Sequence, residues 1–188
     1  MSIESILSIF LGIGLAASVG FRVFVPLFIL SLAAHFQVWE LNESWQWIGS
    51  MSTIVVFGVA TFIEIIAYYI PYIDNLLDTI AVPLAAIAGT AIMVSTAIDL
   101  NPVFTWALAI IAGGGTAAVI AGTTSATRFA STSTTAGIAN PVVSTMETGT
   151  SLVLSIVSIF LPIVAIILVC VICFVVFKIY RKFKVAKA

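Results

Sequence analysis

Apolar segments long enough to cross a bilayer make up most of this chain, and polar residues collect in the stretches between them. A membrane-spanning helix needs about 20 predominantly apolar residues. The pattern predicts four ordinary spans, at 51–70, 79–98, 103–122 and 152–177. Two further segments, 5–36 and 123–151, do not fit a simple span. We therefore expect an all-α, polytopic membrane protein with four ordinary spans and two broken or re-entrant helical segments.

The segment 5–36 is apolar, but its 32 residues are too many for one ordinary span. Gly20, Arg22 and Pro26 interrupt it, and proline removes a helical hydrogen-bond donor and clashes with the preceding turn. The pattern favours two short helices that meet near Gly20–Arg22. A single long helix that is tilted and kinked is the alternative.

The segment 123–151 is polar without being charged. It holds 14 Ser or Thr residues among 29, with Arg128 and Glu147 as its only charged side chains. Between two apolar runs, such a stretch is either an external loop or a polar element set into the membrane. We favour the second interpretation because of its similarity to the first segment.

That similarity suggests an internal repeat. Arg22 and Arg128 each follow a span rich in small residues, and each is followed by a lone glutamate (Glu64, Glu147) and then by a proline-containing span. Inverted repeats are typical of small transporters, in which discontinuous helices meet near the bilayer midplane. Coincidence among similar apolar helices is the alternative. The predicted units are residues 1–100 and 101–178 as the two membrane repeats, and 179–188 as a basic tail.

Composition and charge support the membrane class and set an orientation. Only 8% of the residues are charged, against about 25% in a typical soluble domain. Five of the seven Lys and Arg residues lie in the last eleven positions, so the positive-inside rule predicts a cytoplasmic C-terminus. No basic patch remains for nucleic acid. In this topology the segment 5–36 dips into the membrane from the inside and 123–151 from the outside, and a homo-oligomer is plausible.

The polar residues of the two unusual segments form a candidate binding site. A guanidinium group binds a carboxylate or phosphate through two hydrogen bonds, and hydroxyl groups add further donors. The candidate substrate-binding residues are Arg22, Arg128, Ser125, Thr127, Ser131, Thr132, Thr134 and Asn140.

Four acidic residues are candidates for proton or ion coupling, since acids inside a bilayer usually face a polar interior. They are Glu64, Glu147, Asp74 and Asp78. We expect the ion pairs Arg22–Glu64 and Arg128–Glu147, or the crossed pairs. A headgroup-level Glu64, close to interfacial Tyr68 and Tyr69, and a solvated turn that contains both aspartates are the alternatives.

Three stretches resemble a known family: IFLGIGLAASVGFRVFVPLFILSLAAHF, PYIDNLLDTIAVPLAAIAGT and TRFASTSTTAGIANPVVSTMETGTS. The family consists of small bacterial integral membrane proteins and is known only as a domain of unknown function. The resemblance covers nearly the whole chain. It implies a multi-pass protein of a bacterial inner (cytoplasmic) membrane, and it implies no activity or catalytic residue.

The best functional hypothesis is a small transporter or channel for a small anionic solute or a lipid headgroup, with the lipid bilayer and a solute or ion as its partners. The alternative is a structural or assembly protein whose Arg/Glu pairs only lock helices together. An enzyme is not expected, because the sequence contains no GxSxG, HExxH or nucleotide-binding motif. His35 is the only histidine, so no metal site and no cofactor is expected.

Overall fold

A computed structural model describes residues 2–70, 73–98 and 100–185 of the chain. Every regular element in these ranges is a helix, which confirms the all-α prediction. The elements are α1 (Ile3–Val19), α2 (Phe24–His35), the 3₁₀ helix η1 (Glu43–Gly49), α3 (Met51–Ala67), α4 (Ile73–Thr96), α5 (Pro102–Leu108), the π-helix η2 (Ala109–Gly114), α6 (Gly115–Thr135), α7 (Asn140–Phe160) and α8 (Pro162–Val185).

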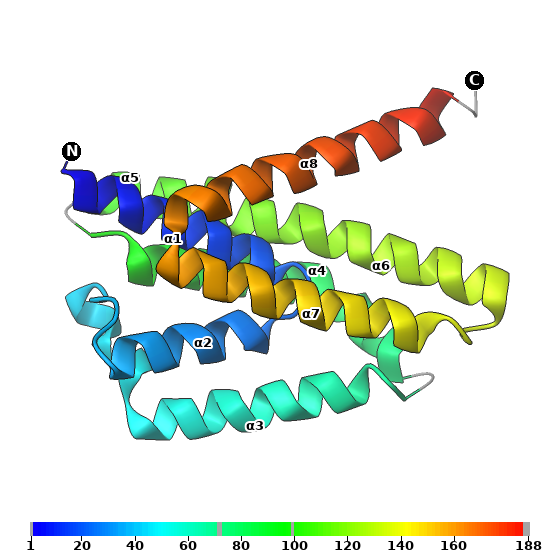
Figure 1. The fold of residues 1–188 in the computed structure, drawn as a ribbon, viewed down its shortest axis with the longest axis horizontal. Coiled ribbons are helices and arrows are strands. Elements are labelled where there is room, and N and C mark those ends of the chain that lie inside the picture. The colour runs from blue at the N-terminus through cyan, green and yellow to red at the C-terminus, as the bar shows by residue number, and fades with distance from the viewer. Residues whose placement is uncertain (1, 71–72, 99, 186–188) are drawn as a thin grey trace.

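The first apolar segment is a helical hairpin. α1 ends at Val19 and α2 begins at Phe24, so the predicted break near Gly20–Arg22 is confirmed. α2 runs back toward the end of the molecule at which α1 begins (Figure 1). Because α1 has 17 residues, the hairpin turn lies about 25 Å from the start of that helix. The turn is therefore deep in the bundle.

The hydroxyl-rich stretch is not a separate segment, and this part of the prediction is wrong. α5, η2 and α6 form one helix of 34 residues, Pro102–Thr135, which continues well past the expected end at Gly122. The side chains of Thr123, Thr127 and Thr134 donate hydrogen bonds to main-chain carbonyls four residues earlier, so these hydroxyls are satisfied inside the helix. The chain turns at residues 136–139, with Ala136 and Gly137 at positive φ.

The expected span 152–177 is divided between two helices. α7 ends at Phe160, Leu161 takes a non-helical conformation, and α8 begins at Pro162. Proline cannot donate the hydrogen bond that would continue α7. The indole of Trp39, from the loop after α2, donates to the carbonyl of Ile159 at 2.7 Å, which caps the end of α7. α8 then runs back across the molecule and diverges from α7 (Figure 1).

Three helices are long and apolar enough to cross a membrane, or four if η1 and α3, which meet at 63°, count as one span. This count covers the described residues and supports a multi-pass membrane protein. The turn at 136–139 and the end of α8 lie at the same end of the molecule, opposite the N-terminus (Figure 1). In the expected topology the segment 5–36 enters from the side that holds the C-terminus. The α1–α2 hairpin instead opens at the end opposite the end of α8 (Figure 1), so this part of the topology is wrong. Which end faces the cytoplasm stays a prediction.

The inverted repeat is not confirmed. Arg22 lies in a break between two helices, whereas α6 continues without a break through Arg128. The unit boundaries at 100/101 and 178/179 remain predictions. Asp99, beside the first boundary, and the last three residues of the basic tail, 186–188, lie outside the described residues.

The hairpin packs at the centre of the bundle. α1 contacts α4, α7 and α8, and its Leu11 and Leu15 lie in the main apolar core with Ile92 of α4. α4 also packs closely on η2: a Cβ atom at Gly113 would lie 2.6 Å from the carbonyl oxygen of Gly89. The glycine run at 113–115 thus allows two backbones to approach closely, which is the packing role that small residues have in membranes.

Candidate functional site

Arg22 lies in the turn of the hairpin and uses all five of its guanidinium N–H groups. Nε donates to the hydroxyl of Thr148 at 3.0 Å, and Nη2 donates to both the carbonyl and the hydroxyl of Ser144. Nη1 donates to the carbonyl of Phe21 and to Oε2 of Glu147, at 3.1 and 2.9 Å. Arg22 is only 1% exposed. It therefore joins the hairpin turn to α7 with every donor satisfied.

Arg128 projects from α6 into the same cluster, and one of its guanidinium nitrogens has no hydrogen-bond partner among the described residues. Its Nε and Nη2 donate to the carboxylate of Glu147, and Oδ1 of Asp78 is 3.8 Å from Nε. Nη1 is buried and has no hydrogen-bond partner. A buried polar group without a partner carries a desolvation cost, so this nitrogen is the part of the cluster most suited to a ligand.

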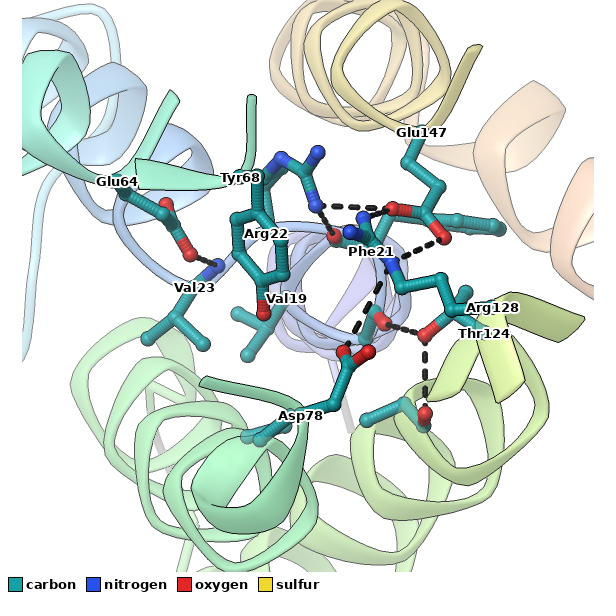
Figure 2. A pocket seen from close by; sticks show the side chains of 14 residues that line it. Val19, Phe21, Arg22, Val23, Glu64, Tyr68, Asp78, Thr124, Arg128 and Glu147 are labelled. Carbon is teal, nitrogen blue, oxygen red and sulfur yellow. Dashed lines mark hydrogen bonds and ion pairs between the residues drawn. The ribbon is translucent and has the colours of Figure 1, made fainter. Parts of the chain in front are cut away.

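Glu147 is shared by both arginines. Its Oε2 accepts hydrogen bonds from Arg22 and from Arg128, while Oε1 accepts from Nε of Arg128 at 3.2 Å. Figure 2 shows the two guanidinium groups converging on this carboxylate. The expected pair Arg128–Glu147 is thus confirmed, and Arg22 forms the crossed pair with the same residue.

Glu64 stabilises the hairpin by another route. Its carboxylate oxygens accept hydrogen bonds from the main-chain N–H groups of Val23 and Phe24, at 2.7 and 3.0 Å. Val23 is the N-cap of α2 and has no capping side chain of its own, and an anion at a helix N-terminus is favourable. Within the described residues, no ion pair joins Glu64 to Arg22. The expected Arg22–Glu64 pair is therefore wrong, because the carboxylate caps α2 (Figure 2).

Tyr68 completes the cluster. The guanidinium carbons of Arg22 and Arg128 lie 4.1 and 4.0 Å from the centre of its ring, within the range of a cation–π interaction. Tyr68 is 8% exposed, so its ring is buried among the helices, and its predicted depth at the membrane interface stays a prediction. Its ring lies beside two positive charges deep in the protein.

A small cavity lies against the cluster. Arg22, Arg128, Glu64, Asp78 and Glu147 contribute to its wall. Its volume is about 10 Å³, which is close to the space needed by one water molecule. A larger solute can reach Arg128 only after the surrounding helices move apart.

The comparisons with known proteins give a family. Residues 9–182, almost the entire chain, match the family model described as Domain of unknown function (DUF4126). The chain belongs to this family. No curated protein and no solved structure matches it. Membership of the DUF4126 family assigns no activity to the chain.

The predicted hydroxyl groups of the DUF4126 chain divide into buried and exposed ones. Ser125 and Ser131 each have a buried hydroxyl with no partner. Thr127 and Thr134 are exposed and donate to the carbonyls of Thr123 and Ala130 in their own helix. The last two are seven residues apart, two turns of one helix face, and they lie away from Arg128.

A second polar group lies beyond Asp78, toward the turn at 136–139. Asp74 is buried, and its Oδ2 accepts a hydrogen bond from Nδ2 of Asn140 at 2.8 Å. The same Nδ2 donates to the hydroxyl of Thr132 at 2.9 Å. The structure thus brings Asp74, Thr132 and Asn140 together, and the alternative of a solvated turn does not hold for Asp74. Among the described residues, no group of three or more His, Cys, Asp or Glu side chains is placed to hold a metal ion.

The sequence analysis missed Tyr68, Ser144 and Thr148 as members of the cluster. A signal for each was present in helical spacing. Tyr68 follows Glu64 by four residues, and Ser144, Glu147 and Thr148 have the 3–4 spacing of one helix face. The signal for Ser144 and Thr148 was hidden by the many other hydroxyl residues of the same stretch.

Proposed function

We propose that this protein is a small multi-pass transporter or channel for a small anionic solute or a lipid headgroup, which binds at Arg128. The observation that supports the proposal is the buried Nη1 of Arg128, which has no partner and belongs to a residue in the cavity wall. A guanidinium group recognises carboxylate and phosphate oxygens. Arg22 has no free donor, so its role in the proposal is to hold the hairpin turn against α7.

Glu147 takes the place of the substrate in the closed state. Its carboxylate binds both arginines and is itself an anion of the kind that a guanidinium recognises. An incoming anion replaces part of this contact on Arg128, while Arg22 retains Glu147. The small cavity fits a closed conformation, and entry of the solute requires movement of α6 or α4 around Arg128.

The positive-inside rule gives this proposal an orientation. With a cytoplasmic C-terminus, the turn at 136–139 is also cytoplasmic, because the two lie at the same end of the molecule (Figure 1). The hairpin of α1 and α2 then enters from the opposite side. A cysteine introduced at Thr134 is expected to react with a maleimide from the cytoplasmic side, and reaction from the opposite side alone would reverse the orientation.

Flux through reconstituted vesicles tests the proposal. Vesicles containing the wild-type chain, Arg128→Gln or Thr127→Ala are compared with empty vesicles for uptake of radiolabelled acetate and phosphate and for scrambling of a fluorescent phosphatidylglycerol. Wild type and Thr127→Ala, whose side chain is exposed on the same helix, are expected to move at least one of these probes. Arg128→Gln is expected to lose that flux while remaining folded.

The structural alternative is favoured by one observation, the full saturation of Arg22. It predicts that wild-type vesicles match empty vesicles for all three probes. It also predicts that Arg128→Gln affects stability without affecting flux. Either result contradicts a transport role for Arg128.

A further inference from the structure

A second cavity, of about 330 Å³, lies at the end of the molecule that holds the turn at 136–139. Asp74 and Asn75 from α4, Thr132 from α6 and Asn140 from α7 give its wall a polar side. The described residues that line it include no lysine, arginine or histidine. This wall is rich in oxygen atoms and contains one carboxylate.

Asp74 is a buried acid without a direct ion-pair partner among the described residues. It is 3% exposed, and no ion pair within 4 Å involves it in the described part of the chain. Both of its oxygens accept hydrogen bonds, from the N–H of Asn75 and from Nδ2 of Asn140, each at 2.8 Å. This is the pattern of an ionised carboxylate, which only accepts. A buried charge of this kind is expensive without a partner of opposite sign.

Asn140 supplies an unused acceptor beside this carboxylate. Its orientation is fixed, because the nitrogen has to face the acceptor-only carboxylate of Asp74 and the hydroxyl of Thr132. The oxygen, Oδ1, is then buried without a hydrogen-bond partner. Asn140 is 5% exposed and lies in the cavity wall. A donor or a cation entering from the cavity would satisfy this oxygen.

We propose that Asp74, Asn140 and Thr132 form a binding site for a monovalent cation, Na⁺ or K⁺, which enters from this cavity. Hard cations bind carboxylate, amide and hydroxyl oxygens, and these are the groups present. One carboxylate matches one positive charge, whereas calcium sites usually gather several carboxylates. The cation completes the charge balance of Asp74 and gives Oδ1 of Asn140 a partner.

This site adds a coupling cation to the proposed function, and its role in transport rests on that proposed function. Asp74 and Asp78 are one helical turn apart on α4, and Oδ1 of Asp78 lies 3.8 Å from Arg128. Three carboxylates, of Glu64, Asp78 and Glu147, already accompany the two arginines around the cavity, so an anion at Arg128 adds a further negative charge. A cation at Asp74 compensates for that charge, and the two sites then fill together.

The test is thermal unfolding of the purified full-length chain in detergent. Na⁺ or K⁺ replaces N-methyl-D-glucamine at constant chloride and ionic strength. A ligand that binds only the folded state raises its stability in a saturable way. A saturable rise in unfolding temperature is expected for wild type and for Thr127→Ala, whose exposed side chain lies on α6 and is not part of the cavity wall.

Asp74→Asn and Asn140→Ala are expected to lose the saturable rise. Asn140→Asp places a second carboxylate at the site and is expected to lower the half-saturating cation concentration. This variant keeps the test decisive if Asn140→Ala does not fold. The absence of a saturable rise in wild type, or its persistence in Asp74→Asn, overturns the cation site.

The unfolding measurement and the flux measurement in vesicles test the two proposals separately. A cation-dependent rise without flux in vesicles would refute the proposed function and leave the cation site standing. Flux without any cation-dependent rise would refute the cation site and leave the proposed function standing.

Discussion

Arg22 and Arg128 bind the same carboxylate and lie over the same tyrosine ring, yet their surroundings differ. Arg22 donates five hydrogen bonds, three of them to neutral oxygens of Ser144 and Thr148 on α7. Arg128 donates only to Glu147 and retains a buried free nitrogen. Two buried arginines in one cluster therefore differ in their hydrogen bonds: the first has every donor satisfied, and the second keeps a free nitrogen for the ligand that we propose.

The backbone explains the difference. Arg22 lies in a break between two helices, where its own turn supplies the carbonyl of Phe21 and α7 packs directly against it. Arg128 lies in an unbroken helix whose carbonyls are already used. A guanidinium in such a helix depends on side chains from neighbouring helices for its partners, and the described neighbours satisfy only part of it.

The largest expected effect comes from Glu147, the partner that the two arginines share. Glu147→Gln leaves two buried guanidinium groups without a directly bonded carboxylate, since Asp78 is 3.8 Å from Arg128 and Glu64 is bonded to the start of α2. Breaking a buried ion pair costs about 3–5 kcal/mol, and we expect a loss of this size in the free energy of unfolding, measured by titration with SDS in mixed micelles.

A second substitution sharpens this prediction. Adding Arg128→Gln to Glu147→Gln removes one unpaired charge, so part of the lost stability should return, and a double-mutant cycle measures the coupling. Additive losses would show that Arg128 and Glu147 do not form the pair described here.

A substitution of Glu64 is expected to affect the hairpin turn without affecting the arginine cluster. Glu64→Gln removes the charge that caps α2 and weakens two hydrogen bonds to main-chain donors, for an expected loss of about 1–3 kcal/mol. Hydrogen exchange at Val23 and Phe24 should accelerate, while the amides of α6 around Arg128 keep their protection. Faster exchange around Arg128 instead would mean that Glu64 acts on the cluster and not on the cap.

Tyr68 is expected to have a smaller effect. Tyr68→Leu removes the ring that lies near both guanidinium groups and should cost about 1–2 kcal/mol. Tyr68→Phe keeps the ring and serves as the control, with a free energy of unfolding close to that of wild type. Equal losses in the two variants would assign the effect to the hydroxyl group and refute the cation–π contact.

The smallest effects should come from the hydroxyl groups that face away from Arg128. Thr127→Ala and Thr134→Ala remove only hydrogen bonds within α6 and should stay within about 0.5 kcal/mol of wild type. Ser125→Ala, on the side of α6 near the cluster, is the matched variant with which the free energy of unfolding and the flux of Thr127→Ala are compared. A large loss of flux in Thr127→Ala would place that hydroxyl in the binding site, contrary to the structure.

The sequence predicted the helical class, the break at Gly20–Arg22 and the Arg128–Glu147 pair because each has a local signal. Glycine and proline mark a break, and charged residues are too costly in an apolar chain to remain unpaired. The membrane class followed directly from the composition.

The parts that could not be predicted depend on three-dimensional packing. The cap that Glu64 provides for α2 joins residues 41 positions apart, and nothing in the sequence near Val23 indicates it. The hydroxyl-rich stretch misled the prediction because threonine satisfies its own hydroxyl within a helix, so polarity alone did not show where α6 ends. Pro162 marks the break after α7, but the hydrogen bond from the indole of Trp39 to the carbonyl of Ile159 comes from a distant loop and has no local signal.

The most direct test of the difference between the two arginines is the free energy of unfolding of Arg22→Gln and of Arg128→Gln, measured side by side. Arg22→Gln removes hydrogen bonds to Ser144 and Thr148 that have no counterpart at Arg128. We predict that it is the less stable variant by at least about 1 kcal/mol, the value of a typical hydrogen bond. An Arg128→Gln variant that is equally or more destabilised would contradict the assignment of Arg22 as the structural link and Arg128 as the ligand-binding group.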